Sequence, residues 1–466
     1  MSEPGLFCKI RLIQAQLPHR VSTDARCQRR PVRRHTQRVL MLSRETAIIF
    51  GLNISIELQL TTNCGLCNLQ WGRSKQCGAD VTVDVKTGAI ASVNHSPLLD
   101  LFRAAAALLV LFGHARNWFF TSITAVDHPS LLLKLFWLIT VLQHEAVVIF
   151  FVISGFLVGG AMVNSLNKNT FDLRKYLIAR FARIYIVYVP ALIVTALVFW
   201  IGRSVLHDFG GDTIRPLFSE AQPDLGGLRA ALCHLAGVQG FVCIAWKQNP
   251  ALWSLGYEWV LYLFAPAILG LAVGRGAWGI RLTGIALLLF GAAAMSGDMQ
   301  EWGFWFSTWF MGVAASRVSR AYRLPMMVGL VGLCLVIGGM AFSRLQILPA
   351  TATDAVITTG AALAVACRPL VSFSLAPRFF GWAASFSYSL YATHLPIIFL
   401  TIACLQNVGF PAHKLLPGAL AFSEFGICAI TSLVFAYVFS LFTERRTDYL
   451  RSRLSDAVLR KELLPA

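Results

Sequence analysis

Apolar runs long enough to cross a lipid bilayer follow one another from Pro97 almost to the end of the chain. A spanning helix needs about 20 apolar residues, and it suits the bilayer because it pairs its own backbone groups. The chain is 56% apolar and only 14% charged, whereas a soluble domain is about one quarter charged. The sequence therefore predicts an all-α, multi-pass membrane protein with about ten transmembrane helices. The ten runs are 99–121, 142–163, 184–202, 251–273, 280–296, 302–316, 326–342, 353–371, 386–405 and 419–442.

An eleventh, weaker candidate, Leu228–Trp246, is interrupted by polar and glycine residues between positions 234 and 240. Because Lys and Arg prefer cytoplasmic loops, their distribution tests whether this segment spans. If it does not span, nearly all basic clusters fall on one face of the membrane and the acidic loops on the other. We therefore expect a re-entrant or interfacial segment here, with both termini in the cytoplasm.

Residues 1–95 form a separate region with nine basic and two acidic residues among the first 40. The region lacks a spanning run and the apolar core of a secretory signal. We expect a basic, largely disordered cytoplasmic arm, with Met41 as an alternative start. The membrane domain is expected at residues 96–443, and a basic cytoplasmic tail at residues 444–466.

The chain carries 40 Lys and Arg against 23 Asp and Glu. No basic stripe interleaved with aromatic residues marks a nucleic-acid-binding domain, so we do not expect nucleic acid as a partner. We expect the basic residues to interact with the head groups of the lipid bilayer. Cys64, Cys67 and Cys77 lack a fourth zinc ligand at the usual spacing, so no metal site is expected. Six later cysteines lie in or beside apolar segments and are interpreted as small apolar residues. They are Cys233, Cys243, Cys334, Cys367, Cys404 and Cys428.

Ionisable residues within the apolar runs carry the functional signal, because a charge at the bilayer centre costs at least ~2.5 kcal/mol. Arg103 and His114 are eleven residues apart, which places them on one helical face, about 16 Å apart along the axis. His114 then lies near mid-membrane and can perform chemistry, while Arg103 can hold an anion near the cytoplasmic surface. The alternative is an anchoring arginine and a structural histidine.

Two further patterns fit packing as well as function. The pair Ser154-Gly155 allows another helix to approach closely. Arg180 and Arg183 are three residues apart and so are neighbours on one helical face, where two guanidinium groups can grip phosphates. Ordinary anchoring at the membrane surface is the alternative for these arginines.

Ser254, Glu258 and Tyr262 follow at four-residue spacing and so form one stripe on a helix. Helix rise places Glu258 at a depth that His114 can reach. A carboxylate bonded to one imidazole nitrogen would stabilise the cation formed when the other nitrogen takes a proton, and we expect this pair. The alternative is a structural hydrogen bond between helices.

Tyr391 and His394 lie three residues apart in the apolar run at 386–405, and therefore on one helical face. We expect His394 near mid-membrane, where the two side chains can bind hydroxyl groups of an acceptor. A structurally satisfied histidine and a hydroxyl-lined helix contact are the alternatives.

In their order and helical placement, these segments resemble the acyltransferase-3 family of integral membrane acyltransferases, over about residues 96–443. The family O-acylates bacterial surface polysaccharides, lipopolysaccharide, glucans and related molecules. It commonly has a Glu followed closely by Pro at the end of the last helix, whereas this chain has Glu444-Arg445-Arg446. The long N-terminal arm is a second departure. The matching pieces are Leu99-Asp100-Leu101-Phe102-Arg103 with His114, Phe150-Phe151 with Ser154-Gly155, Arg180 with Arg183, Trp253-Ser254-Leu255 with Glu258, and Ser387-Tyr388-Ser389 with Tyr391 and His394.

The resemblance implies that His114 is the catalytic residue and that Arg103, Arg180 and Arg183 serve an acyl-CoA donor, with acetyl-CoA as the leading candidate. The residue pattern adds Glu258 as the catalytic partner of His114. We further expect substrate-binding roles for Ser154, Tyr262, Tyr391 and His394, and no permanently bound cofactor.

The expected function is acyl transfer from a cytoplasmic acyl-CoA to a hydroxyl of a cell-surface or exported saccharide, in the inner or plasma membrane. Direct attack by the alcohol and an acyl-histidine intermediate both fit the residues. A secondary transporter of an anionic or glycosidic solute is the alternative function, but no internal repeat marks it. A non-catalytic scaffold would not explain the buried ionisable residues.

Overall fold

A computed structural model of the chain describes residues 97–205, 228–246, 248–274, 299–367, 378–411 and 414–459. The chain divides into two units, Met1–Asn94 and His95–Ala466, and all described residues belong to the second. The described residues are helical and contain isolated β-bridges but no strand, which confirms the all-α fold. The expected N-terminal arm, the C-x-x-C cysteines and the expected helix at 280–296 lie outside the described residues.

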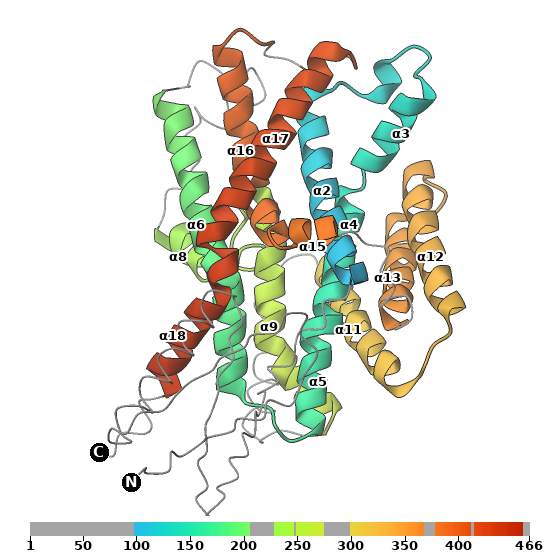
Figure 1. The fold of residues 1–466 in the computed structure, drawn as a ribbon, viewed down its shortest axis with the longest axis vertical. Coiled ribbons are helices and arrows are strands. Elements are labelled where there is room, and N and C mark those ends of the chain that lie inside the picture. The colour runs from blue at the N-terminus through green and yellow to red at the C-terminus, as the bar shows by residue number, and fades with distance from the viewer. Residues whose placement is uncertain are drawn as a thin grey trace, which may run out of the picture. The chain divides into compact units, whose positions relative to one another are not determined.

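Helices of very different length make up the membrane domain (Figure 1). In chain order they are α2 (Pro97–Phe119), α3 (Leu131–Thr140), α4 (Gln143–Ser154), the π-helical turn η2 (Gly155–Gly159), α5 (Gly160–Asn167), α6 (Leu173–Ser204), α8 (Leu228–Leu235), the 3-10 turn η3 (Pro250–Leu252), α9 (Trp253–Ala272), α11 (Met299–Ala321), α12 (Met326–Leu345), α13 (Ala350–Ala366), α15 (Arg378–Ala384), α16 (Ser387–Asn407), α17 (Ala419–Phe442), the 3-10 turn η4 (Glu444–Arg446) and α18 (Thr447–Leu459).

Among the described residues, seven helical segments are long and apolar enough to cross a membrane. Two further predicted runs, 302–316 and 353–371, overlap α11 and α13, which are not among these seven. The prediction of several helical membrane spans is therefore confirmed, but the predicted number of about ten is not. The seven segments are Pro97–Phe119, Gln143–Asn167, Leu173–Gly202, Pro250–Ala272, Met326–Leu345, Ser387–Asn407 and Ala419–Val458.

The long helices alternate in direction (Figure 1). We call the end at which α2 begins the near end and the end at which α2 finishes the far end. Helices α2, α6 and α16 run from the near to the far end, and α4–α5, α9 and α17 return. Helix α16 packs against α2, α6 and α17, while the α12–α13 pair packs on α11 and α4. The helices that carry the predicted site residues are therefore neighbours.

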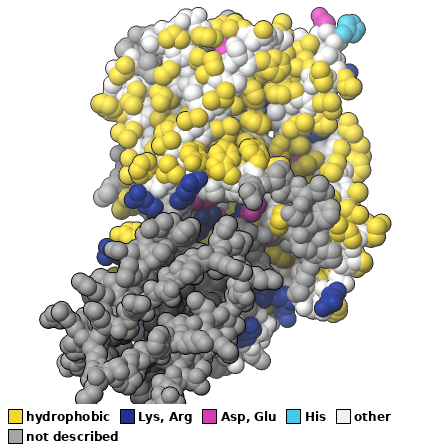
Figure 2. Space-filling model, in the orientation of Figure 1, with side chains coloured by type: hydrophobic (Ala, Val, Ile, Leu, Met, Phe, Trp, Pro, Cys, Tyr) yellow, Lys and Arg dark blue, Asp and Glu magenta, His cyan; other side chains and the backbone are white. Residues whose placement is uncertain are grey.

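Apolar side chains cover much of the face drawn in Figure 2, and the Lys and Arg side chains visible there gather at its lower edge and below. Trp200, Ile337 and Phe442 each expose more than 60% of their surface. Large exposed apolar surfaces of this kind mark contact with a partner or a membrane. Together with the seven apolar segments, this surface indicates a protein embedded in a bilayer.

Glycine permits a backbone contact between α4 and α11. A Cβ atom on Gly155 would lie 1.9 Å from the carbonyl oxygen of Trp309, and one on Gly312 would lie 2.1 Å from that of Val152. No larger residue fits at either position without moving a helix. The Ser154-Gly155 pair thus allows the close approach expected from sequence, and it carries Ser154 to the side chain of Trp309.

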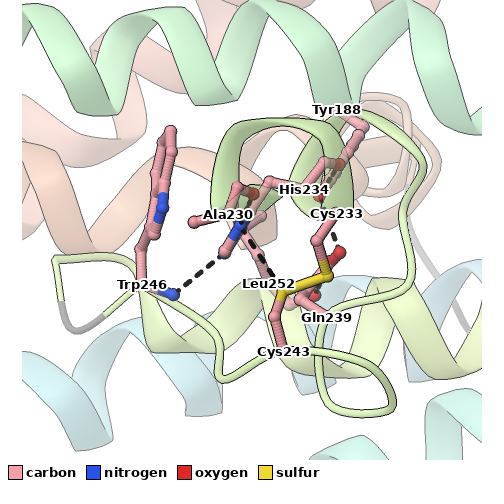
Figure 3. The surroundings of a disulfide bond; sticks show 8 residues. All are labelled: Tyr188, Ala230, Cys233, His234, Gln239, Cys243, Trp246 and Leu252. Atoms are coloured by element: carbon pink, nitrogen blue, oxygen red, sulfur yellow. Dashed lines mark hydrogen bonds between the residues drawn. A yellow bond between two sulfur atoms is a disulfide. The ribbon is translucent and has the colours of Figure 1, made fainter. Parts of the chain in front are cut away.

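The segment Leu228–Trp246 does not form a spanning helix. Helix α8 is only eight residues long, and Gly237 and Gly240 then turn the chain with φ values of +69° and +83°, which only glycine adopts without strain. Cys233 and Cys243 form a disulfide across this turn (Figure 3). Reading these two cysteines as small apolar residues was therefore wrong, because the turn brings together side chains that lie ten positions apart.

Side chains fasten this disulfide-closed segment to the neighbouring helices (Figure 3). The Tyr188 hydroxyl donates to the His234 carbonyl at 2.7 Å and to Gln239 Oε1 at 2.9 Å. The Gln239 amide in turn donates to the Leu252 carbonyl at 2.7 Å. Gln239 thus ties the segment to both α6 and the start of α9, the helix that carries Glu258.

Candidate active site

Two histidines face each other at the centre of the candidate site. His114 lies on α2, five residues before its end, and His394 on α16. Their ring centroids are 5.1 Å apart and the ring planes are inclined by 36°. His394 is 1% exposed. The two imidazoles therefore form a close pair on adjacent helices.

Hydrogen bonding fixes the tautomer of His394. Its Nδ1 lies 2.8 Å from the carbonyl oxygen of Tyr391 and 3.2 Å from that of Leu390. Because a carbonyl can only accept, Nδ1 must carry the proton. Nε2 is buried and has no hydrogen-bond partner among the described residues. His394 thus presents a bare nitrogen lone pair within the protein, as a proton acceptor requires.

Glu258 is the centre of a second polar group, built by α4, α9 and α11. Its Oε1 accepts from Ser154 Oγ at 2.9 Å and from the Tyr262 hydroxyl at 2.6 Å. The Trp309 indole N–H donates to Ser154 Oγ at 3.1 Å. The predicted stripe of Glu258 and Tyr262 is therefore present, and its partner across the interface is Ser154.

The arginines lie toward the near end and are neutralised incompletely. We call Arg103, Arg180 and Arg183 the near-end arginine group. Arg180 lies over the rings of Tyr262 and Tyr176, at 5.6 and 6.0 Å from the centroids, and its Nε is buried without a partner. Arg103 is repelled electrostatically by Arg183 and attracted by Asp100 and Glu444. Neither Arg103 nor Arg180 forms an ion pair with a described residue.

Arg183 is held by a buried carboxylate from the end of the last spanning segment. Its Nη2 lies 3.2 Å from Glu444 Oε1, and the guanidinium stacks over the ring of Tyr388 at 5.3 Å. Glu444 Oε2 accepts from both the backbone N–H and the hydroxyl of Ser389, at 3.1 and 3.0 Å. Both carboxylate oxygens are therefore satisfied, and Arg183 is fixed in direction.

Tyr391 connects the group around Glu258 with the histidine pair. Its hydroxyl lies 2.6 Å from Ser254 Oγ on α9, one helical turn before Glu258. Its ring packs against those of His394 and Phe150, with centroids 5.9 and 6.0 Å away. One run of side chains therefore leads from the near-end arginine group, through α9 and α16, to the two imidazoles.

Proline shapes both helices of this run. Pro266 and Pro396 have no N–H to donate to the carbonyls of Tyr262 and Ala392, one turn earlier. Another part of the chain supplies the missing donor each time: the Tyr176 hydroxyl of α6 reaches the Tyr262 carbonyl at 3.1 Å, and the amide of Asn249, directly before η3, reaches the Ala392 carbonyl at 2.9 Å. Asn249 is fully buried. The backbone beside Tyr262 and His394 is thus held from outside its own helix.

A family model described as an acyltransferase domain matches residues 97–441. The chain belongs to the acyltransferase-3 family. An uncharacterized protein of Haemophilus influenzae is 35% identical over 147 residues, which are 30% of this chain and 56% of the relative. The chain thus spans about half the length of the curated relative that it matches. No solved structure matches the chain.

The predicted site residues of this acyltransferase-3 family member fall into connected groups. His114 lies with His394 and Tyr391, and Glu258 lies with Ser154, Tyr262 and Arg180. No hydrogen bond joins Glu258 to His114 in the described part of the chain, so the expected pair is absent from this structure. Helix rise gave their depths, but it says nothing about the direction in which each side chain leaves its helix.

Other residues of the acyltransferase site were not recognised from sequence. Glu444 was noted only as a departure from the family pattern, yet it holds Arg183. Tyr176 and Trp309 were not singled out. The sequence signal for Glu444 was its place at the end of the last apolar run, where the family also carries a glutamate.

Proposed function

We propose that this acyltransferase moves an acyl group, acetyl in the simplest case, from a cytoplasmic acyl-CoA to a hydroxyl of a cell-surface or exported saccharide. The observation that carries the proposal is the pair of facing imidazoles, one with a bare nitrogen, in a member of the acyltransferase-3 family. Oxygen acylation needs a base for the hydroxyl proton, and imidazole suits that task at neutral pH.

The near-end arginine group is the proposed donor site. Among the described residues, neither Arg180 nor Arg103 forms an ion pair with a carboxylate, although Arg103 interacts electrostatically with Asp100 and Glu444. Guanidinium groups bind phosphates through paired hydrogen bonds, and an acyl-CoA carries phosphates. Tyr176 and Tyr388 support the arginines through their rings. The thioester arm would then extend along Tyr391 toward the histidines.

We propose His114 as the general base in a direct transfer. One ring nitrogen takes the proton of the acceptor hydroxyl while the oxygen attacks the thioester carbonyl carbon. The tetrahedral intermediate collapses, the carbon–sulfur bond breaks, and the CoA thiolate takes the proton from the His114 imidazolium. His394, neutral and with a bare Nε2, favours the cation on His114 because its lone pair is a negative pole.

The disulfide supports an orientation with both termini in the cytoplasm. The disulfide Cys233–Cys243 lies in the connection that leaves α6 at the far end and leads to α9, although α8 itself lies beside the middle of α6 (Figure 1). Disulfides persist in oxidising compartments and are rare in the cytosol, so this connection favours the far end on the non-cytoplasmic side of an inner or plasma membrane. The acceptor hydroxyl would then reach His114 from the far end, and the donor would arrive from the near end.

Purified protein in liposomes tests the proposal, with labelled acetyl-CoA supplied to the near-end face. We expect wild type to release CoA, and His114→Ala to lose 10²–10⁴-fold in rate, the usual range for removal of a general base. His128→Asn is the matched control, because His128 lies in an exposed loop with φ +54° that asparagine tolerates. Wild type that moves a solute but never releases CoA would support a transporter instead.

Labelled donor without acceptor distinguishes the two chemical routes. Label that remains on a His114-containing peptide after rapid acid quench would support an acyl-histidine intermediate and contradict direct transfer. Direct transfer predicts unlabelled protein and slow hydrolysis of the donor by water.

A further inference from the structure

The first turn of α4 forms a polar cluster with α11, α12 and α13 that the donor site does not use. Arg344 of α12 pairs with Glu145, which also accepts from Ser343 Oγ at 2.7 Å. His144 Nε2 lies 3.0 Å from Asp354 Oδ2 of α13. We call Gln143, His144, Glu145, Trp305, Arg344 and Asp354 the far-end cluster. Three helix ends meet there in addition to α11.

The far-end cluster leaves both donors and acceptors unused. Glu145 and Trp305 are 1% and 2% exposed, yet Glu145 Oε2 and the Trp305 indole N–H have no partner among the described residues. Gln143 Oε1 and Arg344 Nε are also buried and unpartnered. Each buried polar group without a partner costs about 1–3 kcal/mol. A ligand that both donates and accepts hydrogen bonds, as each hydroxyl group does, would satisfy them.

The far-end cluster adjoins His114. Gly113 precedes that histidine, and a Cβ atom at Gly113 would lie only 2.2 Å from Gln143 Oε1. The ring of Trp305 packs against those of His144 and Trp253, with centroids 5.6 and 5.0 Å away. Trp253 begins α9, directly before Ser254, which bonds Tyr391 beside His394. The unused polar atoms therefore lie next to the residues proposed for chemistry.

Each carboxylate of the cluster already has a basic partner, Arg344 for Glu145 and His144 for Asp354. Arg116 of α2, which is 8% exposed, interacts electrostatically with Arg344 and adds a positive charge beside the cluster. The hydroxyl groups of a saccharide would fill the remaining hydrogen-bonding positions without displacing either carboxylate. At the edge of the cluster, the side chains of His144 and Arg344 are 48% and 28% exposed.

We propose that Gln143, Glu145 and Trp305 form the acceptor subsite, which binds neighbouring hydroxyl groups of a saccharide and presents one of them to His114. This assignment rests on the proposed function and adds to it the location of the acceptor. Glu145 accepts from one hydroxyl, and the Trp305 indole donates to another. A purely structural cluster would need neither free position.

Trp305→Phe is the sharpest test, because it removes an N–H that has no partner in the described part of the chain and keeps an aromatic ring. Trp302→Phe is the matched control, on the same helix, one turn away and 8% exposed. The assay supplies labelled acetyl-CoA with cellobiose or 1-butanol as acceptors and measures acetyl transfer and acetyl-CoA hydrolysis separately.

We expect wild type to transfer to cellobiose in preference to butanol, and Trp305→Phe to lower this preference three- to tenfold, the effect of one lost hydrogen bond. Hydrolysis and the KM for acetyl-CoA should stay unchanged in both variants. Wild type that hydrolyses acetyl-CoA without preferring cellobiose would overturn the subsite, as would an equal loss in Trp302→Phe. Absence of any acetyl-CoA turnover would instead refute the proposed function itself.

Discussion

The near-end arginine group and the far-end cluster both bury charge among the helices, but they neutralise it differently. Among the described residues, only Arg183 of the three near-end arginines forms an ion pair, and Arg180 lies against tyrosine rings. In the far-end cluster, each carboxylate pairs with a basic group, and buried donors and acceptors remain unused. Guanidinium groups without an ion-pair partner favour a phosphate-bearing ligand, whereas unused donors and acceptors favour one rich in hydroxyl groups. Different helices therefore build two different environments: α2 and α6 carry the arginines, and α4, α11, α12 and α13 carry the cluster.

The largest expected effect lies where the two regions meet. His394→Gln removes the bare Nε2 beside His114 and replaces it with an amide. We expect acyl transfer and acyl-CoA hydrolysis to fall together by about 10²-fold, the lower part of the range for acid–base groups, because both ligands use the same base. A loss confined to transfer would assign His394 to the acceptor alone, and assays of both reactions on one preparation decide this.

The disulfide tests which side of the membrane the far end faces. Replacing Cys233 and Cys243 together with serine should cost about 2–3 kcal/mol, the expected cost for a loop of this size, seen as a lower Tm in detergent. In intact cells we expect both thiols to resist alkylation until reductant is added. Two freely reactive thiols in the native protein would place the far end in a reducing compartment, and the sides assigned to donor and acceptor would then be exchanged.

Charge-conserving substitutions compare the two arginine environments directly. Arg180→Lys keeps a cation but loses the planar fork that grips phosphate, so we expect the KM for acyl-CoA to rise about tenfold, or ~1.4 kcal/mol. Arg344→Lys should leave this KM unchanged, because Arg344 serves Glu145. An equal increase in the KM for acyl-CoA in both variants would show that the near-end arginine group is not the only region that recognises the donor.

The smallest expected effect is a dependence of stability on pH at the disulfide-closed segment. Burial lowers the pKa of His234 below its ordinary value, although its bond to the Ala230 carbonyl acts in the opposite sense. The folded protein therefore holds His234 neutral while the unfolded chain binds a proton near pH ~6.5. The neutral His234 therefore contributes its full stabilisation above pH ~6.5, and this stabilisation is lost as the pH falls below that value toward the lowered pKa of the folded state.

Thermal unfolding at several pH values below neutrality checks this prediction. His234→Phe keeps a ring against Trp246, with which His234 stacks, and should flatten the dependence by at most the slope of one proton, ~1.4 kcal/mol per pH unit. His128→Asn should leave the slope as in wild type. An unchanged slope in His234→Phe would assign the pH dependence to other groups.

Features that depend on a single helix were predictable from sequence. The apolar runs at 99–121 and 419–442 match α2 and α17 within two residues. The stripe of Glu258 and Tyr262 and the neighbouring Arg180 and Arg183 required only helical periodicity.

Features that depend on two helices were not predictable, because sequence does not give the rotation of one helix against another. The expected pair of His114 with Glu258 required that rotation, and so did the far-end cluster, where Glu145 meets Arg344 from α12. The disulfide needed the turn between α8 and α9, which apolar composition does not reveal. One residue was within reach: Glu444, as an acidic residue at the end of an apolar run, needed only to be treated as costly to bury.

Asn249 and Pro396 have consequences for how this site can evolve. The proline leaves the Ala392 carbonyl without its helical donor, and the asparagine of another segment supplies one. If Pro396 is replaced by a residue with an N–H, Asn249 keeps only its bond to Thr195 Oγ1, whereas loss of Asn249 first leaves a buried oxygen without a partner. Related sequences are therefore expected to change these two positions together, and in that order.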